Sequence, residues 1–205
     1  MSNEYDIIAK IYDPALYLAL RSVRLAVLNE LLPYKDKAII DIRCGTGDQL
    51  KLLLKNGFKN LHCLDISRAM LAVAQKNSSQ LNFYHKDAAD TEFDKGSFDI
   101  AIISFALHEK DRRTQENMIS EAHRIVKKNG LILIIDYVFD QQSSIIGKIG
   151  IHTIERIAGK EHYQNFRSYL QNNGLAGLLK NDQFKLIKES RKLFSGVTIS
   201  SYQRL

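Results

Sequence analysis

The sequence predicts an α/β protein with a mostly parallel sheet, helices on both faces and a C-terminal antiparallel hairpin. Short apolar, β-branched runs alternate with segments of helical spacing from residue 38 to residue 138. Repeated β-α-β units of this kind form parallel sheets with right-handed crossovers. Two closing strands are predicted at 183–191 and 195–203, and their short connection requires them to be antiparallel. Together these segments indicate seven strands.

The N-terminal segment 5–32 is predicted to form one or two helices ahead of the sheet. Its apolar residues recur at helical spacing, and Pro14 after Asp13 suits the first turn of a helix with Asp13 as the N-cap. Pro33 closes this region.

The remaining elements follow from apolar runs and turn residues. Helices are expected over 47–56, after the capping residue Ser67, and over 112–127, with Asn-Gly pairs at Gly57 and Gly130 as C-caps. Helical pieces broken at Gly159 and Gly174 fill 144–181. Strands are expected over 38–43, 61–65, 81–85, 98–105 and 131–138. No linker divides the chain, so we predict a single domain over 1–205.

Composition favours an ordinary globular protein. The chain has 205 residues, of which 45% are hydrophobic and 25% charged. No apolar run approaches the roughly 20 residues of a membrane span, and the first residues lack the pattern of a secretory signal. We therefore expect a cytoplasmic protein in which Cys44 and Cys63, at the ends of adjacent strands, are thiols. Two cysteines and a stray histidine are too few ligands for zinc, so no metal site is expected.

The net charge of +6 favours a solvated, lysine-rich surface. No basic block is interleaved with aromatic residues, as it often is in nucleic-acid binders. Attraction of RNA, an anionic lipid or an acidic metabolite stays open as the alternative.

The most informative segment runs from Asp41 to Asp48, where a strand passes through a turn with Gly45 and Gly47 into a helix. Such a turn brings backbone N–H groups close to a ligand. Asp65 lies about 20 residues past the glycines, where a carboxylate accepts hydrogen bonds from ribose hydroxyls. A dinucleotide fingerprint would need a glycine at position 50, which is Leu50, so NAD is disfavoured.

The pattern Asp-x-x-x-Gly-x-Gly, followed by Asp65 and then Asp87-Ala88, resembles the class I S-adenosylmethionine (SAM) methyltransferases. The segments 5–13, 45–48 and 123–130 look like the ubiquinone/menaquinone-biosynthesis type (methyltransferase type 11), a small-molecule branch. The resemblance implies the seven-stranded sheet of that family, a Rossmann-like fold, and SAM as the cofactor. It also implies that 5–32 and 144–181 cover the active site.

The resemblance implies roles for individual residues. Asp87 would lie near the adenine amino group and Ala88 would offer a backbone N–H to the ring. Tyr12, Tyr163 and Phe166 would wall a pocket for an apolar or aromatic acceptor, although aromatic residues at such spacing also suit a core. The residues expected to bind the cofactor are Tyr12, Asp41, Arg43, Gly45, Gly47, Asp65, Ile66, Asp87, Ala88 and Ser104.

Arg43 stands where the family has the first glycine of its motif. Three outcomes are open. The side chain turns aside and leaves SAM binding intact but weaker, or it pairs with a carboxylate of the cofactor, of a modified cofactor or of an acidic substrate. In the third outcome it fills the pocket and leaves a methyltransferase fold without the reaction.

Methyl transfer needs alignment of donor and nucleophile, and a base where the nucleophile carries a proton. His108, just past the strand 98–105, is the first candidate because imidazole titrates near neutral pH, and Glu109 is the second. The alternative for His108 is an ordinary loop histidine. The chain has neither an Asn/Asp-Pro-Pro-Tyr/Phe motif after this strand nor a Pro-Cys pair. A small-molecule acceptor is therefore favoured, with an RNA methyltransferase as the alternative.

Overall fold

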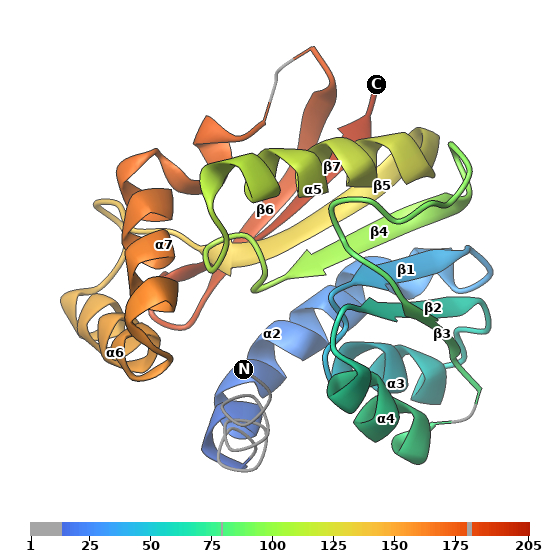
Figure 1. Cartoon of the computed structure of the whole chain (residues 1–205), viewed down its shortest axis with the longest axis horizontal. Helices are drawn as coiled ribbons and strands as arrows, with labels where there is room; N and C mark the ends of the chain where they lie inside the picture. Colours follow the sequence, from blue (N-terminus) through green and yellow to red (C-terminus); the bar gives the residue numbers. More distant parts are fainter. Residues whose placement is uncertain (1–13, 79, 180–181) are drawn as a thin grey trace.

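The structure, a computed structural model, describes residues 14–78, 80–179 and 182–205. A single sheet runs through the molecule with helices on both sides (Figure 1). Among the described helices, none has the length and apolar character that a membrane crossing requires. The elements are α2 (Pro14–Leu31), η1 (Leu32–Tyr34), β1 (Ile39–Ile42), α3 (Asp48–Lys55), β2 (Leu61–Asp65), α4 (Arg68–Asn77), β3 (Asn82–His85), β4 (Phe98–Ser104), α5 (Arg112–Ile125), β5 (Val126–Tyr137), α6 (Ile145–Ile157), α7 (Lys160–Gln171), η2 (Gly174–Gly177), β6 (Phe184–Lys192) and β7 (Val197–Arg204).

The seven strands lie in the order β3-β2-β1-β4-β5-β7-β6. The pairs from β3 through β5 are parallel, and β7 is antiparallel to both β5 and β6. This confirms the predicted sheet and its closing hairpin. The strand order reverses between β1 and β4, so a crevice opens beyond the carboxyl ends of these two parallel strands.

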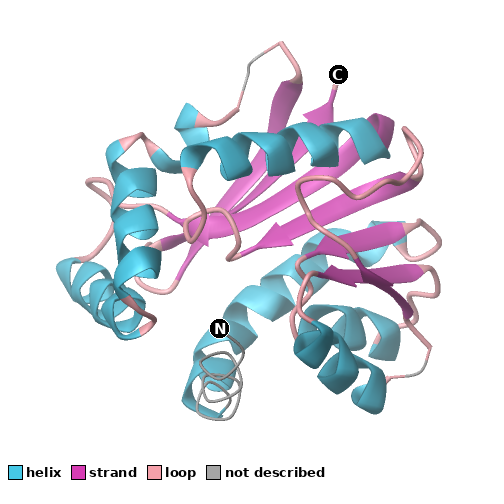
Figure 2. Cartoon of the chain, in the orientation of Figure 1, coloured by secondary structure: helices cyan, strands magenta, loops and turns pink. Residues whose placement is uncertain are grey.

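Each face of the sheet has its own hydrophobic core, as Figure 2 shows by the helices above and below the strands. On one face, α2, α3 and α4 pack on side chains such as Ile39 and Ile100. On the other face, α5, α7 and η2 pack on alternate residues such as Ile40 and Ile103. The continuous apolar runs of the parallel strands follow from this double coverage.

The expected helical region 144–181 is confirmed as α6, α7 and η2, with breaks near Gly159 and Gly174. The helix α2 begins at Pro14 and runs to Leu31, which agrees with the C-terminal part of the predicted segment 5–32. Residues 5–13, including the proposed N-cap Asp13, lie outside the described residues.

The boundary between α5 and β5 differs from the prediction. The helix ends at Ile125 and β5 begins at Val126, so Asn129-Gly130 lies within the strand and is not a helix cap. The register against β4 shifts between Phe98 and Ile100, as at a β-bulge. A Cβ on Gly130 would lie 2.6 Å from the backbone oxygen of Asp99, so the close strand approach explains the glycine.

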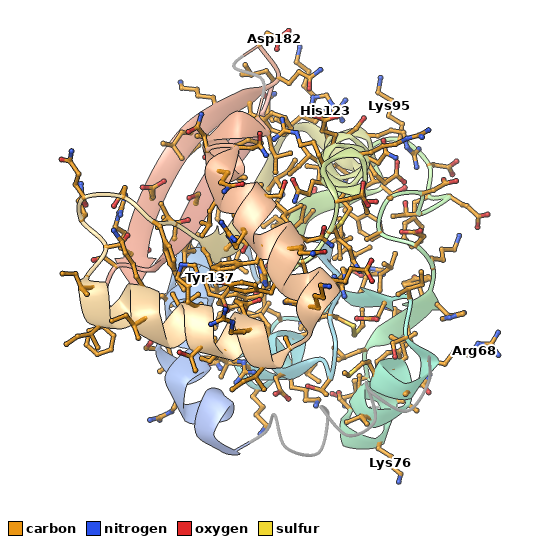
Figure 3. All side chains as sticks on the ribbon, turned by 60° about the vertical axis from the view of Figure 1, so that its left-hand side comes forward. Arg68, Lys76, Lys95, His123, Tyr137 and Asp182 are labelled. Carbon is orange, nitrogen blue, oxygen red and sulfur yellow. A yellow bond between two sulfur atoms is a disulfide. The ribbon has the colours of Figure 1, made fainter. Side chains whose placement is uncertain are left out.

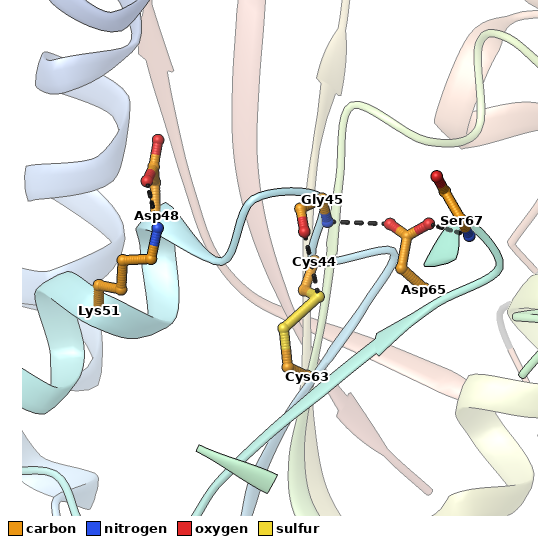
Figure 4. The surroundings of a disulfide bond; sticks show 7 residues. All are labelled: Cys44, Gly45, Asp48, Lys51, Cys63, Asp65 and Ser67. Carbon is orange, nitrogen blue, oxygen red and sulfur yellow. Dashed lines mark hydrogen bonds and ion pairs between the residues drawn. A yellow bond between two sulfur atoms is a disulfide. The ribbon is translucent and has the colours of Figure 1, made fainter. Parts of the chain in front are cut away.

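The expectation of two free thiols is wrong in this structure, because Cys44 and Cys63 form a disulfide (Figure 4). Parallel pairing of β1 with β2 brings their Cα atoms to 5.4 Å, a separation that a disulfide readily spans. The bond ties the turn before Gly45 to β2 two residues before Asp65.

Reduction of this disulfide is expected to destabilise the protein. The bond joins residues separated by 19 positions, and closing a loop of this length is worth about 3 kcal/mol. For a chain of this size that corresponds to a fall in Tm of about 6–12 °C. Thermal unfolding with and without dithiothreitol measures the effect. The variant Cys63→Ala is the control and should not respond to the reductant; equal Tm values for the oxidised and reduced wild type would contradict this prediction.

Candidate functional site

A cavity of about 300 Å³ lies at the carboxyl ends of β1, β2 and β4, where the strand order reverses. Ligands of open α/β sheets bind at this position. Its walls combine the strand ends with the start of α5 and one side of α7. The lining residues are Arg43, Ile66, Asp87, Ala88, Glu109, Lys110, Asp111, Thr114, Met118, Glu161 and Asn165.

The buried carboxylate of Asp65 holds the glycine turn in place. Its Oδ2 accepts a hydrogen bond from the backbone N–H of Gly45 at 2.9 Å, and its Oδ1 accepts one from Ser67 at 2.8 Å (Figure 4). Gly47 then starts α3 with a left-handed φ of 74°, which glycine adopts without steric cost. One carboxylate therefore fixes both the turn after β1 and the turn after β2.

Asp41 lies directly beneath this turn, at the third position of β1. Burial and the nearby charge of Asp65 raise the pKa of the Asp41 carboxyl to about 7. Its Oδ1 is buried and accepts no hydrogen bond. The ionised form of Asp41 is therefore unfavourable in the folded protein.

Arg43, at the position of the motif glycine, has a backbone conformation that favours glycine. Its φ is 81°, in the left-handed region where a non-glycine residue costs roughly 1–3 kcal/mol. Its guanidinium forms an ion pair with the Glu109 carboxylate, and the Arg43 side chain is only 17% exposed. This pair is none of the three outcomes open from the sequence, because its carboxylate is supplied by the protein itself.

The ion pair spans the crevice from the end of β1 to the loop between β4 and α5. The Nζ of Lys110 also forms an ion pair with Oε1 of Glu109, at 3.3 Å. Burial, together with the neighbouring Arg43 charge, lowers the pKa of Lys110. The Nδ2 of Asn165 donates a hydrogen bond to the backbone oxygen of Glu109 at 3.0 Å, which joins α7 to the same loop.

His108 lies behind this pair and is 3% exposed. Its Nδ1 is 2.6 Å from a carboxylate oxygen of Asp136, on β5, and the same carboxylate accepts the backbone N–H of Leu107 at 3.1 Å. Burial disfavours the imidazolium, but Asp136 and the nearby Glu155 carboxylate outweigh it and raise the pKa of His108. The predicted base His108 is therefore enclosed, whereas the predicted base Glu109 faces the cavity.

The structure brings together part of the expected site. Of the expected residues, five line the cavity, namely Arg43, Ile66, Asp87, Ala88 and Glu109. Others form the strand ends and turns around it, namely Asp41, Gly45, Gly47, Asp65 and Ser104. Tyr12 lies outside the described residues.

Tyr163 and Phe166, the expected acceptor wall, belong to an aromatic cluster under α7. Phe166 is fully buried and its ring contacts those of His108, Tyr137 and Tyr163. Figure 3 places Tyr137 close to α6 and α7. The alternative of a core aromatic residue therefore fits Phe166, and the wall of the cavity on α7 is formed by Glu161 and Asn165.

Several residues of the site could not be selected from the sequence. Lys110 follows the predicted strand 98–105, and Asp136 lies near the end of the predicted strand 131–138. This position was the only feature of the sequence that pointed to either residue. Glu155 and His162 come from α6 and α7, and only helix packing brings them to His108.

The fold and the site define a class of protein. Residues 39–130 match the family described as "Methyltransferase domain", and this stretch holds β1 to β4, the glycine turn and most of the cavity wall. Over this stretch the chain is similar to methyltransferase domains.

Relatives in that family are distant. The chain is 27% identical over 147 residues to a ubiquinone/menaquinone biosynthesis C-methyltransferase UbiE of Rhizobium johnstonii, covering 67% of this chain and 55% of the relative. A protein of the same name from Campylobacter jejuni is 27% identical over 118 residues, covering 55% of this chain and 49% of the relative. The chain thus spans about half the length of the curated relatives that it matches.

Solved structures share the fold at low identity. The magnesium protoporphyrin IX methyltransferase of Synechocystis, with bound S-adenosylhomocysteine, aligns with a TM-score of 0.70 at 17% identity, over 100% of this chain and 95% of that one. A 1,6-didemethyltoxoflavin-N1-methyltransferase of Burkholderia thailandensis aligns with a TM-score of 0.62 at 15% identity, over 99% and 84%. These similarities establish the architecture.

The buried Asp41 predicts a dependence of stability on pH. A carboxyl whose pKa is raised by folding destabilises the folded state increasingly as pH rises from its unfolded pKa, near 4, through its folded pKa of about 7. The substitution Asp41→Asn removes this penalty. Its advantage in unfolding free energy over the wild type should grow by about 2–3 kcal/mol between about pH 5 and about pH 8.

Urea unfolding at several pH values measures this difference. The matched control is Asp36→Asn, which makes the same substitution at an exposed position. A difference from the wild type that stays constant with pH for Asp41→Asn would contradict the buried, proton-binding carboxyl.

Proposed function

We propose that this chain binds SAM in the cavity at the switch point and transfers its methyl group to a small-molecule acceptor. The observation that carries the proposal is the junction of β1 and β2. There Asp65 fixes Gly45, while Ile66, Asp87 and Ala88 line the adjoining cavity. The order of these residues on successive strand ends is the one expected from the family resemblance.

The residues present fit such a cofactor. An added Cβ on Gly45 would meet no atom within 4 Å, so the glycine turn has an open side. Ile66 is 55% exposed and offers an apolar surface to a purine ring, beside the Asp87 carboxylate and the Ala88 backbone. When bound, SAM would supply an electrophilic methyl group on a sulfonium, and the thioether that remains after transfer is a good leaving group.

Arg43 supports this assignment on one condition. The amino-acid end of the cofactor carries a carboxylate, which can take the place of Glu109 as the partner of the guanidinium. This exchange would hold the methionine part of the cofactor by a bidentate pair and release Glu109 toward the acceptor. Arg43 would then be a binding residue of the cofactor site.

The protein's part in the chemistry is alignment and exclusion of water. Of the two candidate bases, Glu109 faces the cavity and is within reach of an acceptor, whereas His108 is enclosed. In this proposal Glu109 accepts the acceptor's proton where the nucleophile carries one. The segment 144–181 covers the active site through α6 and α7, within a single domain over 1–205.

The names of the relatives support a small-molecule acceptor. The cavity of about 300 Å³ is at the lower end of the range for small-molecule pockets, as expected for the cofactor alone. The similar proteins named above are methyltransferases of ubiquinone/menaquinone biosynthesis, of magnesium protoporphyrin IX and of 1,6-didemethyltoxoflavin. We place the protein in the cytoplasm, where thiol reduction would open the Cys44–Cys63 bond.

A second candidate function is a non-catalytic protein on the same fold. The observation that favours it is the ion pair between Arg43 and Glu109, which crosses the crevice where the methionine part of the cofactor would lie. If the pair persists, the cofactor is excluded and the reaction is lost.

Calorimetric titration with S-adenosylhomocysteine separates the two functions. We expect the wild type to bind one equivalent with a micromolar Kd, and Arg43→Gly to bind more weakly by about tenfold, because one charge-assisted pair is lost. Arg113→Ala, at an exposed position of α5, is the matched control and should bind like the wild type.

The other results would contradict the proposal. No binding by the wild type together with binding by Arg43→Gly would mean that the arginine closes the site, as in the non-catalytic alternative. Failure of both proteins, each shown to be folded by circular dichroism, would remove SAM as the cofactor.

A further inference from the structure

Three side chains that suit a transition metal meet behind Glu109. His108 follows β4, Glu155 lies on α6 and His162 on α7, and one ligand atom from each lies within 4.8 Å of the others. The Oε2 of Glu155 is 3.5 Å from Nε2 of His108 and 2.6 Å from Nε2 of His162. The three ligands thus come from three elements and face one point.

The carboxylate of Glu155 gives an independent sign that this point is a binding site. Glu155 is 2% exposed, and its Oε1 accepts a hydrogen bond from the Tyr137 hydroxyl at 2.9 Å. Its Oε2 is buried and faces the imidazole nitrogens of His162, at 2.6 Å, and of His108, at 3.5 Å. A buried carboxylate is costly unless its charge is balanced, and a cation bound between the three side chains would balance it.

The outer nitrogen atoms of both imidazoles face carboxylates. Nδ1 of His108 lies 2.6 Å from Oδ1 of Asp136, and Nδ1 of His162 lies 3.8 Å from Oε2 of Glu109. Histidine ligands of metals are typically oriented in this way, because a carboxylate on the far nitrogen fixes the ring and presents the other nitrogen to the ion.

We propose that His108, Glu155 and His162 bind one divalent first-row transition-metal ion, with zinc as the preferred ion. Two imidazole nitrogens and one carboxylate oxygen form a ligand set that suits zinc and not magnesium or calcium, which prefer oxygen ligands. Tetrahedral zinc at about 2.1 Å from each ligand separates two ligand atoms by about 3.4 Å. The distance of 3.5 Å between Oε2 of Glu155 and Nε2 of His108 matches this value, and the 2.6 Å between Oε2 of Glu155 and Nε2 of His162 would widen by about 0.8 Å.

Three protein ligands leave one coordination position open. His162 is the most exposed of the three ligands, and its neighbour Glu161 lines the cavity. The open position therefore faces the side of the cluster nearest the cavity, where water or another oxygen ligand completes the coordination. The expectation of no metal site rested on the two cysteines, which lie elsewhere as a disulfide.

The test is zinc binding by the full chain after treatment with EDTA and removal of the chelator. Without thiol reductant the disulfide keeps both cysteines out of the coordination. Titration against a chromophoric chelator should give one zinc per chain with a submicromolar Kd. His162→Ala and Glu155→Gln should each weaken binding by at least about 100-fold, since each removes one of three ligands.

The matched control is His152→Ala, which removes a histidine on the same side of the molecule that is not part of the cluster. It should bind zinc like the wild type. Zinc should raise the Tm of the wild type and of His152→Ala but not of His162→Ala. Cobalt(II) added to the wild type should give the intense visible absorption of a tetrahedral site.

The proposal would be overturned by a wild type that binds no zinc, or by variants that bind it as tightly as the wild type. An equal loss of zinc binding in His152→Ala would also overturn the proposal, because it would indicate binding at the surface. The melting curve in EDTA checks that each variant is folded. If Glu155→Gln fails to fold, His162→Ala alone decides the question, because His162 is partly exposed and its substitution disturbs the core less.

Discussion

The ion pair between Arg43 and Glu109 constrains everything around the crevice. It joins the end of β1 to the loop that leaves β4, across the point where the strand order reverses. Arg43 has a left-handed backbone at the position of a motif glycine, and its side chain crosses the crevice to Glu109. The proposed cofactor site therefore depends on this one pair.

A second layer of buried polar groups supports that pair from behind. Asp136 on β5 fixes His108, and Glu155 on α6 faces both His108 and His162 on α7. These contacts tie α6 and α7 to the sheet through charge and hydrogen bonding as well as through aromatic packing. Anything that binds in the cluster would therefore fix α6 and α7 relative to the loop after β4.

Much of the fold could be predicted from the sequence, because strands buried on both faces give continuous apolar runs between helical segments. The strand-end carboxylates of Asp65 and Asp87 were also predictable from their order. The start of β5 was not, since Gly130 depends on a contact with the neighbouring strand. The pairing of Arg43 with Glu109 and the convergence of Glu155 with His108 arise from tertiary packing, which local periodicity does not encode.

The central claim is that the crevice beside Arg43 is a cofactor site, and nuclear magnetic resonance of the backbone amides tests it most directly. On addition of S-adenosylhomocysteine, the amide signals of Gly45, Ile66 and Ala88 should shift. Gly57, at the far end of α3, should stay unchanged. Unchanged signals for all three residues, or shifts confined to other parts of the chain, would contradict a cofactor site beside Arg43.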